Sequence, residues 1–142
     1  MDVNLQRIVR CALQCTPPVG VLATLELADG EALGTSGDYQ RFFEANGRRY
    51  CHLIDPRTGS PAMHMQSVTI LVSGPHAGTR SDALSKPLFI DDPNTLAAHA
   101  RKLGIQHWLA VDSAGRLHLA PVLRARMALP GEQTVDQGIK PG

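Results

Sequence analysis

Three segments of the sequence place polar and ionisable side chains where predicted strands or helices end. They are residues 34–39 (GTSGDY), 52–59 (HLIDPRTG) and 81–86 (SDALSK). Loops at the ends of regular elements are where a rigid scaffold usually presents binding and catalytic groups. We therefore take these three segments as the candidate functional site.

In this order, the three segments resemble those of the flavin transferase family known as ApbE. Members of that family carry a T-S-G-D-Y segment, an H-x-x-D-P-R-T-G segment and an A-D-A-L-A-T helix. The middle segment is the most specific of the three, because residues 52–59 match a spaced pattern and not a single dipeptide. The resemblance extends from about residue 21 to about residue 115.

The resemblance implies an enzyme that cuts FAD, attaches FMN through a phosphoester to a Ser or Thr of an acceptor flavoprotein, and releases AMP. It also implies a bilobal fold in which FAD lies between the halves and Mg²⁺ bridges its pyrophosphate. Relatives have an amino-terminal half that contributes flavin contacts and part of the metal site. This chain resembles only the carboxy-terminal half, so we expect the amino-terminal half to be missing.

Two residues have the side chains that this chemistry requires. A Ser or Thr hydroxyl is a poor nucleophile at neutral pH, and the imidazole of His52 has a suitable intrinsic pKa for a general base. The phosphoryl group carries charge that a hard cation offsets, and Asp82 offers the oxygen ligand that Mg²⁺ prefers. The resemblance therefore implies that His52 is catalytic and that Asp82 binds the metal.

The remaining motif residues are expected to contact the cofactor. Arg57 offers a fork of donors for phosphate oxygens, and the glycines allow the backbone to approach closely. The cofactor-binding set is Thr35, Ser36, Gly37, Asp55, Arg57, Thr58 and Gly59.

Each of these roles has a structural alternative. Without the resemblance, His52 is interpreted as an ordinary strand histidine. Asp55 is interpreted as the first residue of a turn, with Arg57 as its ion-pair partner. Asp82 taken alone reads as an acidic residue near a helix N-terminus that complements the helix dipole.

The sequence departs from the family pattern at two positions, one of them at the expected metal site. Lys86 stands where the family has a Thr whose hydroxyl helps to hold the metal, and Gln40 stands where an acidic residue is common. On a helix, Lys86 is four residues after Asp82 and can reach its carboxylate. Its ammonium would compete with the metal or partly replace it, whereas Ser85 could supply the missing hydroxyl. The sequence leaves these alternatives open.

Turn residues predict two β-hairpins. Asn46-Gly47 lies between β-rich arms within residues 39–54 and suits a tight primed turn. Residues 108–111 and 116–120 flank a second turn, DSAG. Because side chains alternate along a strand, Cys51 and His52 are expected on opposite faces.

Apolar patterning predicts the other strands and the helices. Residues 20–28 and 32–36 are expected as strands on either side of the Asp29-Gly30 turn, and residues 67–73 as a buried strand. Helices are expected over residues 3–15 and 94–103. A further helix should begin near residue 79, capped by Thr79 or Ser81, and be limited by Pro87.

The order of these elements indicates an α+β fold, with a largely antiparallel sheet and flanking helices. We expect residues 1–18 to form an amino-terminal helix and proline linker, residues 19–129 to form the flavin-transferase-like domain, and residues 130–142 to be a mobile tail.

Composition excludes several classes of partner and site. The net charge of +1 and the 4% aromatic content argue against a nucleic-acid surface. No apolar run has the length of a membrane span, and the three cysteines lack the spacing of a metal site. No export signal is visible, whereas relatives are typically periplasmic or membrane-anchored, so a cytoplasmic location is expected only if the chain is complete.

Three functions remain open at this point. The first is an FMN transferase or part of one, and the second is a module that binds flavin or nucleotide without turnover. The third is a degenerate structural domain in which the motif segments persist only as turns.

Overall fold

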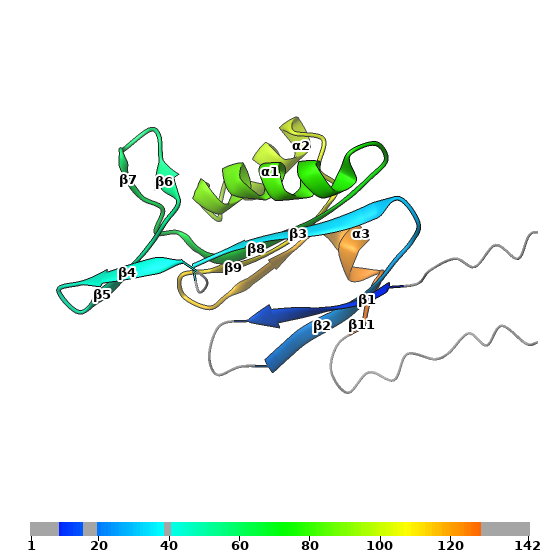
Figure 1. Ribbon diagram of the computed structural model, residues 1–142, viewed down its shortest axis with the longest axis horizontal. Helices are drawn as coiled ribbons and strands as arrows, with labels where there is room; N and C mark the ends of the chain where they lie inside the picture. The colour runs from blue at the N-terminus through cyan, green and yellow to red at the C-terminus, as the bar shows by residue number, and fades with distance from the viewer. Residues whose placement is uncertain (1–8, 16–19, 39–40, 129–142) are drawn as a thin grey trace, which may run out of the picture.

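The computed structural model describes residues 9–15, 20–38 and 41–128 of this 142-residue chain. Two antiparallel sheets lie one above the other, and two helices cover the outer face of the larger sheet (Figure 1). This arrangement confirms the predicted α+β fold with a largely antiparallel sheet. The larger sheet has the order β10-β9-β8-β3, and its strands are β3 (Glu31–Gly37), β8 (Met65–Ser73), β9 (His107–Asp112) and β10 (Leu117–Leu119).

The smaller sheet has the order β1-β2-β11, formed by β1 (Val9–Cys15), β2 (Gly20–Leu27) and β11 (Met127–Ala128). The helices are α1 (Ala77–Ile90), α2 (Leu96–Lys102) and the short α3 (Pro121–Arg124). Two small hairpins complete the described chain, β4 (Phe42–Ala45) with β5 (Arg48–Cys51), and β6 (Ile54–Asp55) with β7 (Ser60–Pro61).

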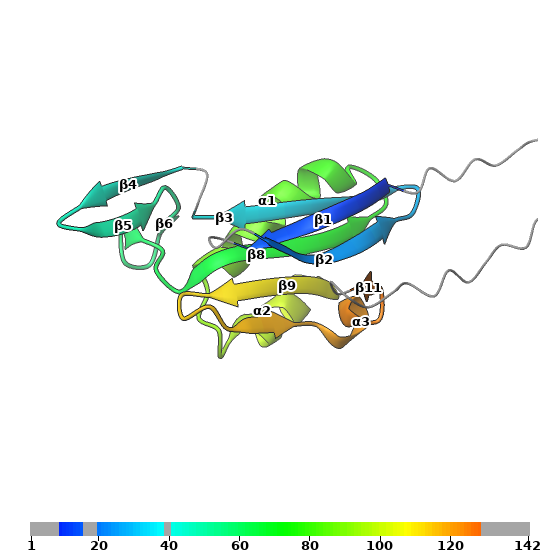
Figure 2. The ribbon, with the colours of Figure 1, turned by 90° about the horizontal axis from the view of Figure 1, so that it is seen from below.

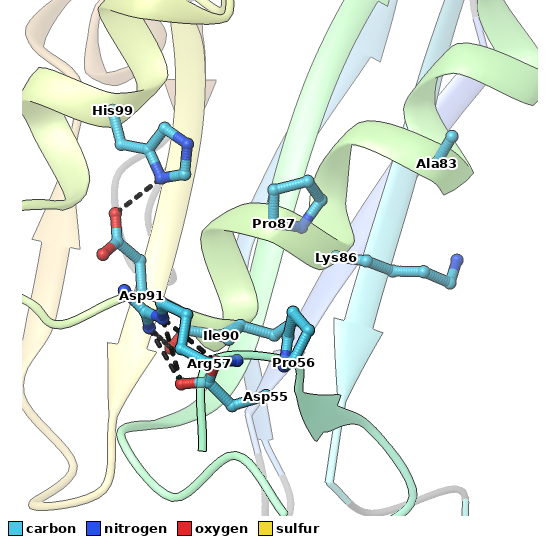
Figure 3. Close-up of a pocket in the computed structure, with 9 residues that line it drawn as sticks. All are labelled: Asp55, Pro56, Arg57, Ala83, Lys86, Pro87, Ile90, Asp91 and His99. Atoms are coloured by element: carbon cyan, nitrogen blue, oxygen red, sulfur yellow. Dashed lines mark hydrogen bonds and ion pairs between the residues drawn. The ribbon is translucent and has the colours of Figure 1, made fainter. Parts of the chain in front are cut away.

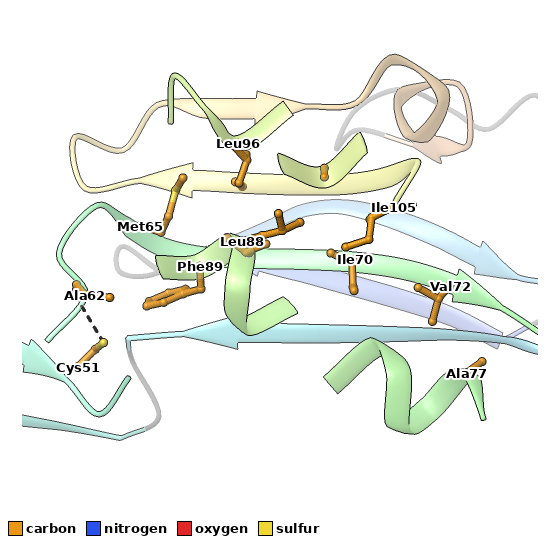
Figure 4. Close-up of a cluster of buried hydrophobic side chains, with 13 residues drawn as sticks. Cys51, Ala62, Met65, Ile70, Val72, Ala77, Leu88, Phe89, Leu96 and Ile105 are labelled. Atoms are coloured by element: carbon orange, nitrogen blue, oxygen red, sulfur yellow. Dashed lines mark hydrogen bonds between the residues drawn. The ribbon is translucent and has the colours of Figure 1, made fainter. Parts of the chain in front are cut away.

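Strand β8 is the centre of the fold because both of its faces are buried. Val68, Ile70 and Val72 belong to the core under α1 and α2 (Figure 4), whereas Leu71 belongs to a second core with the smaller sheet and α3. A strand that is covered on both faces is expected to be apolar along its length. The prediction of a buried strand over residues 67–73 is therefore confirmed.

The hairpin predicted from Asn46-Gly47 is present as β4 and β5. Asn46 and Gly47 have φ angles of 52° and 72°, the left-handed pair that a type I′ turn requires. Figure 1 shows this hairpin at one end of the molecule, away from the stacked sheets. Cys51 is buried and His52 is exposed, as the alternation along the strand predicts.

The prediction of an amino-terminal helix is wrong for the residues that the structure describes. Residues 9–15 form β1, which pairs antiparallel with β2, while residues 3–8 lie outside the described chain. The apolar spacing of this short segment fits a helix, but it also alternates from Val9 to Cys15. Pairing with β2 satisfies the backbone groups in an extended conformation, and this partner is not visible from the local spacing.

The two predicted strands on either side of Asp29-Gly30 are present, but they do not pair with each other. β2 belongs to the smaller sheet and β3 to the larger one, where β3 pairs with β8. Figure 2, seen from below, shows β1 and β2 crossing beneath the larger sheet. The turn therefore carries the chain from one layer to the next.

Helix α1 starts earlier and ends later than predicted. Its N-cap is His76, in the left-handed conformation, in place of Thr79 or Ser81, and the helix continues through Pro87 to Ile90. A proline inside a helix costs about 3 kcal/mol. Leu88 and Phe89 after it are fully buried, and each such side chain contributes about 1.5–3 kcal/mol. Burial of the last turn therefore outweighs the cost of Pro87.

The remaining predictions concern the second half of the chain. Helix α2 lies within the predicted residues 94–103 and is followed by Gly104 with a φ of 71°, and β9 and β10 form the predicted second hairpin. The predicted mobile tail, residues 130–142, lies outside the described residues. Among the described helices, none combines the length and the apolar character that a membrane span requires.

Candidate functional site

The first and third motif segments meet where β3 packs against α1. A hydrogen bond of 2.8 Å joins the hydroxyl oxygens of Ser36 and Ser85, and both side chains are buried. Two residues earlier on β3, Gly34 lies directly against the backbone of Ser81, one turn earlier on the helix. Ser81 and Ser85 therefore form the face of α1 that packs on β3.

The other predicted residues of the first segment do not share this seam. Thr35, next to Ser36 on β3, bonds instead to the hydroxyl of Thr69 on β8, at 2.8 Å between the Oγ1 atoms. Because strand side chains alternate, Thr35 faces the opposite side of the sheet from Ser36. Gly37 is the last residue of β3, and its backbone pairs with Ser67.

The second motif segment forms a tight turn organised by Asp55. The Asp55 carboxylate accepts a hydrogen bond from the backbone N–H of Arg57 at 2.9 Å. It also accepts two from the Arg57 guanidinium, from Nε at 3.0 Å and from Nη2 at 2.9 Å. Gly59 closes the turn, with a φ of 69° and its N–H donated to the Asp55 carbonyl at 2.8 Å. Asp55 thus begins a turn and pairs with Arg57, as the structural alternative expects, and the contact of these residues with a cofactor stays a prediction.

In this turn the Asp55 carboxylate is buried and ionised. The hydrogen bonds from Arg57 hold the pKa of the Asp55 carboxyl below its usual value, so Asp55 is ionised at neutral pH. The carboxylate is buried, whereas 63% of the Arg57 side chain is exposed. Thr58 completes the turn by accepting the backbone N–H of Ser60 at 3.2 Å through its hydroxyl.

A pocket of about 460 Å³ opens between this turn and α1 (Figure 3). Arg57 crosses to the end of the helix, where it donates to the Ile90 carbonyl at 3.3 Å. The pocket has an apolar middle, and charged groups lie at its ends. Its lining consists of Asp55, Pro56, Arg57, Ala83, Lys86, Pro87, Ile90, Asp91 and His99.

Lys86 and Asp82 form an ion pair on the exposed side of α1. The Lys86 Nζ lies 2.8 Å from Oδ1 of Asp82 and 2.8 Å from its carbonyl oxygen. Asp82 is the sixth residue of the helix and lies outside its first turn, so the alternative that it complements the helix dipole is wrong. Ser85, the other predicted metal ligand, points into the seam, where its hydroxyl also contacts the Asp82 carbonyl at 3.0 Å.

His52 is exposed at the end of the β4–β5 hairpin and is held by one neighbour. Its Nδ1 lies 3.0 Å from the carbonyl oxygen of Arg41. Because a carbonyl oxygen only accepts, Nδ1 carries the proton of this bond, and the lone pair of the neutral ring is on Nε2. His52 does not line the pocket, although it lies three residues before Asp55.

Two ionisable residues of the pocket, Asp91 and His99, were not predicted as site residues from the sequence. His99 on α2 bonds through Nδ1 to Oδ2 of Asp91 at 2.8 Å, and Thr95 donates to Oδ1 of the same carboxylate at 2.7 Å. Burial raises the pKa of Asp91. The hydrogen bonds from Thr95 and His99 contribute to a larger opposite effect, so the pKa lies below its usual value. Only the return of α2 beside α1 places His99 here, and no spacing pattern in the sequence signals it.

Asp38, also in the first motif segment, faces a different part of the molecule. It lines a small pocket of about 170 Å³ with Arg49, Cys51 and Met65. Its Oδ1 is buried without a hydrogen-bond partner among the residues that the structure describes, and burial raises the pKa of its carboxyl.

Comparison with known proteins shows which family the sequence is similar to. The sequence profile of the ApbE family matches residues 5–109. The FAD:protein FMN transferase of Rhodobacter capsulatus is 35% identical over 108 residues, which are 76% of this chain and 20% of that protein. The homologous sequences are thus those of transferases.

Solved structures share the fold. The crystal structure of the ApbE protein from Thermotoga maritima superimposes with a TM-score of 0.74 at 31% identity, and the match covers 84% of this chain and 38% of that one. The apo form of the Pseudomonas stutzeri flavinyl transferase ApbE has a TM-score of 0.63 at 31% identity, with 84% and 37% of the two chains covered.

In each of these matches, this chain is much shorter than the protein that it matches. This chain spans about a fifth of the Rhodobacter relative and less than two fifths of the two solved proteins. The family profile nevertheless matches most of its residues, and the fold is that of the corresponding part of the solved structures. The chain therefore belongs to the ApbE family.

Proposed function

We propose that this chain is part of an FAD:protein FMN transferase, with FAD as one substrate and a protein Ser or Thr hydroxyl as the other. One observation carries the proposal. In a chain of the ApbE family, the DPR turn of the second motif and the helix of the third line the same pocket of about 460 Å³. Ligand pockets in proteins are typically about 300–1,000 Å³, and FAD is a dinucleotide, so this pocket suits one of its halves.

The proposed reaction is an attack on the FAD diphosphate. The acceptor hydroxyl oxygen bonds to the phosphorus on the riboflavin side, and the bond between that phosphorus and the bridging oxygen breaks. FMN is then joined to the acceptor by a phosphoester, and AMP leaves with the bridging oxygen. The hydroxyl proton passes to His52 at Nε2, which has the lone pair when Nδ1 donates to the Arg41 carbonyl.

The other motif residues position the ligand in this proposal. The Asp55 carboxylate fixes the Arg57 guanidinium at the mouth of the pocket, where its remaining donors can meet phosphate oxygens. The Ser36–Ser85 hydrogen bond holds β3 against α1, so Lys86 keeps its place at the opposite end (Figure 3).

The test is an assay that counts both products. The chain is incubated with FAD and a flavinylation acceptor of a longer relative, AMP is quantified by chromatography, and acceptor-bound flavin is read from its fluorescence on a denaturing gel. Transfer predicts AMP and labelled acceptor in equal amounts. AMP without labelled acceptor would mean that water is the acceptor, and FAD left intact would contradict the proposal.

A second candidate is a flavin-binding module without turnover. The observation that favours it is the ion pair of Lys86 with Asp82, because it occupies the carboxylate that the resemblance assigns to the metal. Binding of FAD without AMP release in the same assay would select this candidate. A flavin-dependent rise in melting temperature would then report the binding.

A further inference from the structure

Lys86 donates hydrogen bonds to the oxygen atoms of Asp82 that a divalent cation would need as ligands. Its Nζ is 2.8 Å from both Oδ1 and the carbonyl oxygen of Asp82. An ammonium group has three donors, and these two contacts leave one of them for another acceptor. The family pattern has a Thr here, a side chain with a hydroxyl and no charge.

The donors around Asp82 do not fit Mg²⁺. This ion requires octahedral oxygen ligands at about 2.0–2.1 Å, and an adjacent ammonium repels it. The hydroxyl of Ser85 is buried, and its hydrogen bonds join it to the Ser36 hydroxyl and the Asp82 carbonyl. Among the residues whose side chains the structure describes, 23–38 and 41–128, no group of three or more His, Cys, Asp or Glu side chains is arranged to hold a metal ion.

We propose that Lys86 takes the place of the divalent cation in this chain, so that its ammonium, held by Asp82, meets the diphosphate of FAD. The inference rests on the proposed function and deepens it. Binding of the flavin nucleotide is then independent of Mg²⁺. A lysine side chain is an established phosphate ligand because it is a compact, mobile point charge.

The position of Lys86 agrees with this role. It lines the pocket together with Ala83 and Pro87, and Figure 3 shows its side chain extended away from the Asp55–Arg57 pair. The side chain is 39% exposed, so a ligand can reach the ammonium, and Asp82 is 79% exposed, so solvent screens the pair. An exposed ion pair is weakly held, and the ammonium can turn towards a phosphate.

The experiment measures FAD affinity with and without metal. FAD is titrated into the full chain and into Lys86→Thr, Lys86→Gln and Lys86→Arg, each in EDTA and in Mg²⁺, and flavin fluorescence reports binding. The parent and Lys86→Arg should bind equally well in both buffers. Lys86→Gln should bind about tenfold or more weakly in both, because the charge is lost. Lys86→Thr should bind as weakly in EDTA and regain affinity when Mg²⁺ is added.

Controls separate local effects from unfolding. Lys102→Thr removes an exposed lysine of α2 outside the pocket and should bind FAD like the parent in both buffers. Circular dichroism checks that every variant is folded. Should Lys86→Thr unfold, the Lys86→Gln and Lys86→Arg pair still compares the neutral and charged side chains.

The outcomes distinguish this inference from the proposed function. A parent chain whose affinity for FAD rises about tenfold with Mg²⁺ overturns the role of Lys86 and leaves the transferase proposal intact. If Lys86→Gln binds FAD as tightly as the parent, the role of Lys86 is likewise overturned and the transferase proposal stays intact. A parent that binds no FAD in either buffer overturns both.

Discussion

His52 combines the exposure and the tautomer that a general base requires. Its ring is held through Nδ1 by the Arg41 carbonyl, while its side chain fills no part of either hydrophobic core. Truncation therefore removes the imidazole without leaving a cavity. A substitution of His52 can therefore test its proposed role without disturbing the fold.

We expect His52→Ala to keep the far-ultraviolet circular dichroism spectrum and melting temperature of the parent while FMN transfer falls by about 10²–10⁴-fold, the usual contribution of a general base. Flavin fluorescence on the gel-separated acceptor measures the loss. His64→Ala, at another exposed histidine outside the motif segments, should transfer flavin like the parent. Parental transfer by His52→Ala would remove this residue from the mechanism.

Asp112 is a buried carboxylate whose charge stabilises the second hairpin. It is 1% exposed and accepts Nε2 of His118 at 2.8 Å, with further bonds from the Arg116 guanidinium and from the backbone N–H groups of Ala114 and Arg116. The bond from His118, with these others, outweighs the effect of burial and holds the pKa of Asp112 well below its usual value. Asp112 is therefore a structural residue whose protonation state affects folding.

The stability of the chain should consequently depend on acid pH. A carboxyl group whose pKa is lower in the folded than in the unfolded chain stabilises the fold above the unfolded value of about 3.9. This stabilisation is lost as the pH falls towards the folded value. Asp112→Asn should lower the melting temperature at pH 7 and make its fall between pH 7 and pH 3 shallower than in the parent.

Thermal unfolding followed by circular dichroism at both pH values measures this difference. Ser113→Ala, in the same turn, removes no bond to Asp112 and should keep the acid response of the parent. An Asp112→Asn variant that matches the parent at both pH values would show that the charge of Asp112 contributes nothing to the fold.

Helix α1 depends on small residues where it crosses β3. A Cβ built on Gly34 would overlap the backbone carbonyl of Ser81 and come within 2.9 Å of its Cβ. The backbone of a packed helix moves only at a cost, so this contact requires the absence of a side chain on β3. The same seam contains the Ser36–Ser85 bond and positions Lys86 and Ala83 on the pocket.

Gly34→Ala should lower the free energy of unfolding by about 1–3 kcal/mol, the usual range for overpacking. Gly78→Ala is the matched control, because a Cβ at this α1 residue meets nothing within 4 Å. It should be neutral or stabilise the helix by up to about 1 kcal/mol. Urea denaturation of both variants measures the difference, and equal stability would mean that α1 shifts freely on β3.

Contacts between distant parts of the chain assemble the three layers. The Glu31 carboxylate at the start of β3 receives both terminal nitrogens of Arg126, at 2.6 and 2.7 Å, although the two residues are 95 positions apart. The pocket likewise combines residues from the DPR turn, α1 and α2. The site is therefore a product of the assembled domain.

We expect the isolated chain to bind FAD much more weakly than a full-length ApbE protein such as the Thermotoga relative, of which it covers 38%. Tight sites bury about 70–90% of a ligand, and a pocket of 460 Å³ suits only part of a dinucleotide. Fluorescence titration of both proteins gives the two dissociation constants. Submicromolar binding by this chain alone would show that its own residues complete the site.

Much of the fold follows from local patterns in the sequence. The Asn46-Gly47 turn, the apolar run that forms β8 and the DSAG turn of the second hairpin each depend on the conformational preferences of a few adjacent residues. The motif segments were recognisable for the same reason, because their spacing is a property of the linear chain. The family and the approximate positions of most strands could thus be predicted without coordinates.

The exceptions are features that depend on a distant partner. Residues 9–15 form a strand because β2 lies beside them, and α1 continues past Pro87 because Leu88 and Phe89 are buried by β8 and its neighbours. The seam that holds Ser36 on Ser85, and the approach of His99 to the pocket, have no local signal at all. Local preferences are worth at most about 1 kcal/mol for an ordinary residue and about 3 kcal/mol for a proline inside a helix. Each buried large side chain contributes about 1.5–3 kcal/mol, so two of them, such as Leu88 and Phe89, match or exceed either preference. Where the two compete, long-range packing sets the structure and therefore the shape of the site.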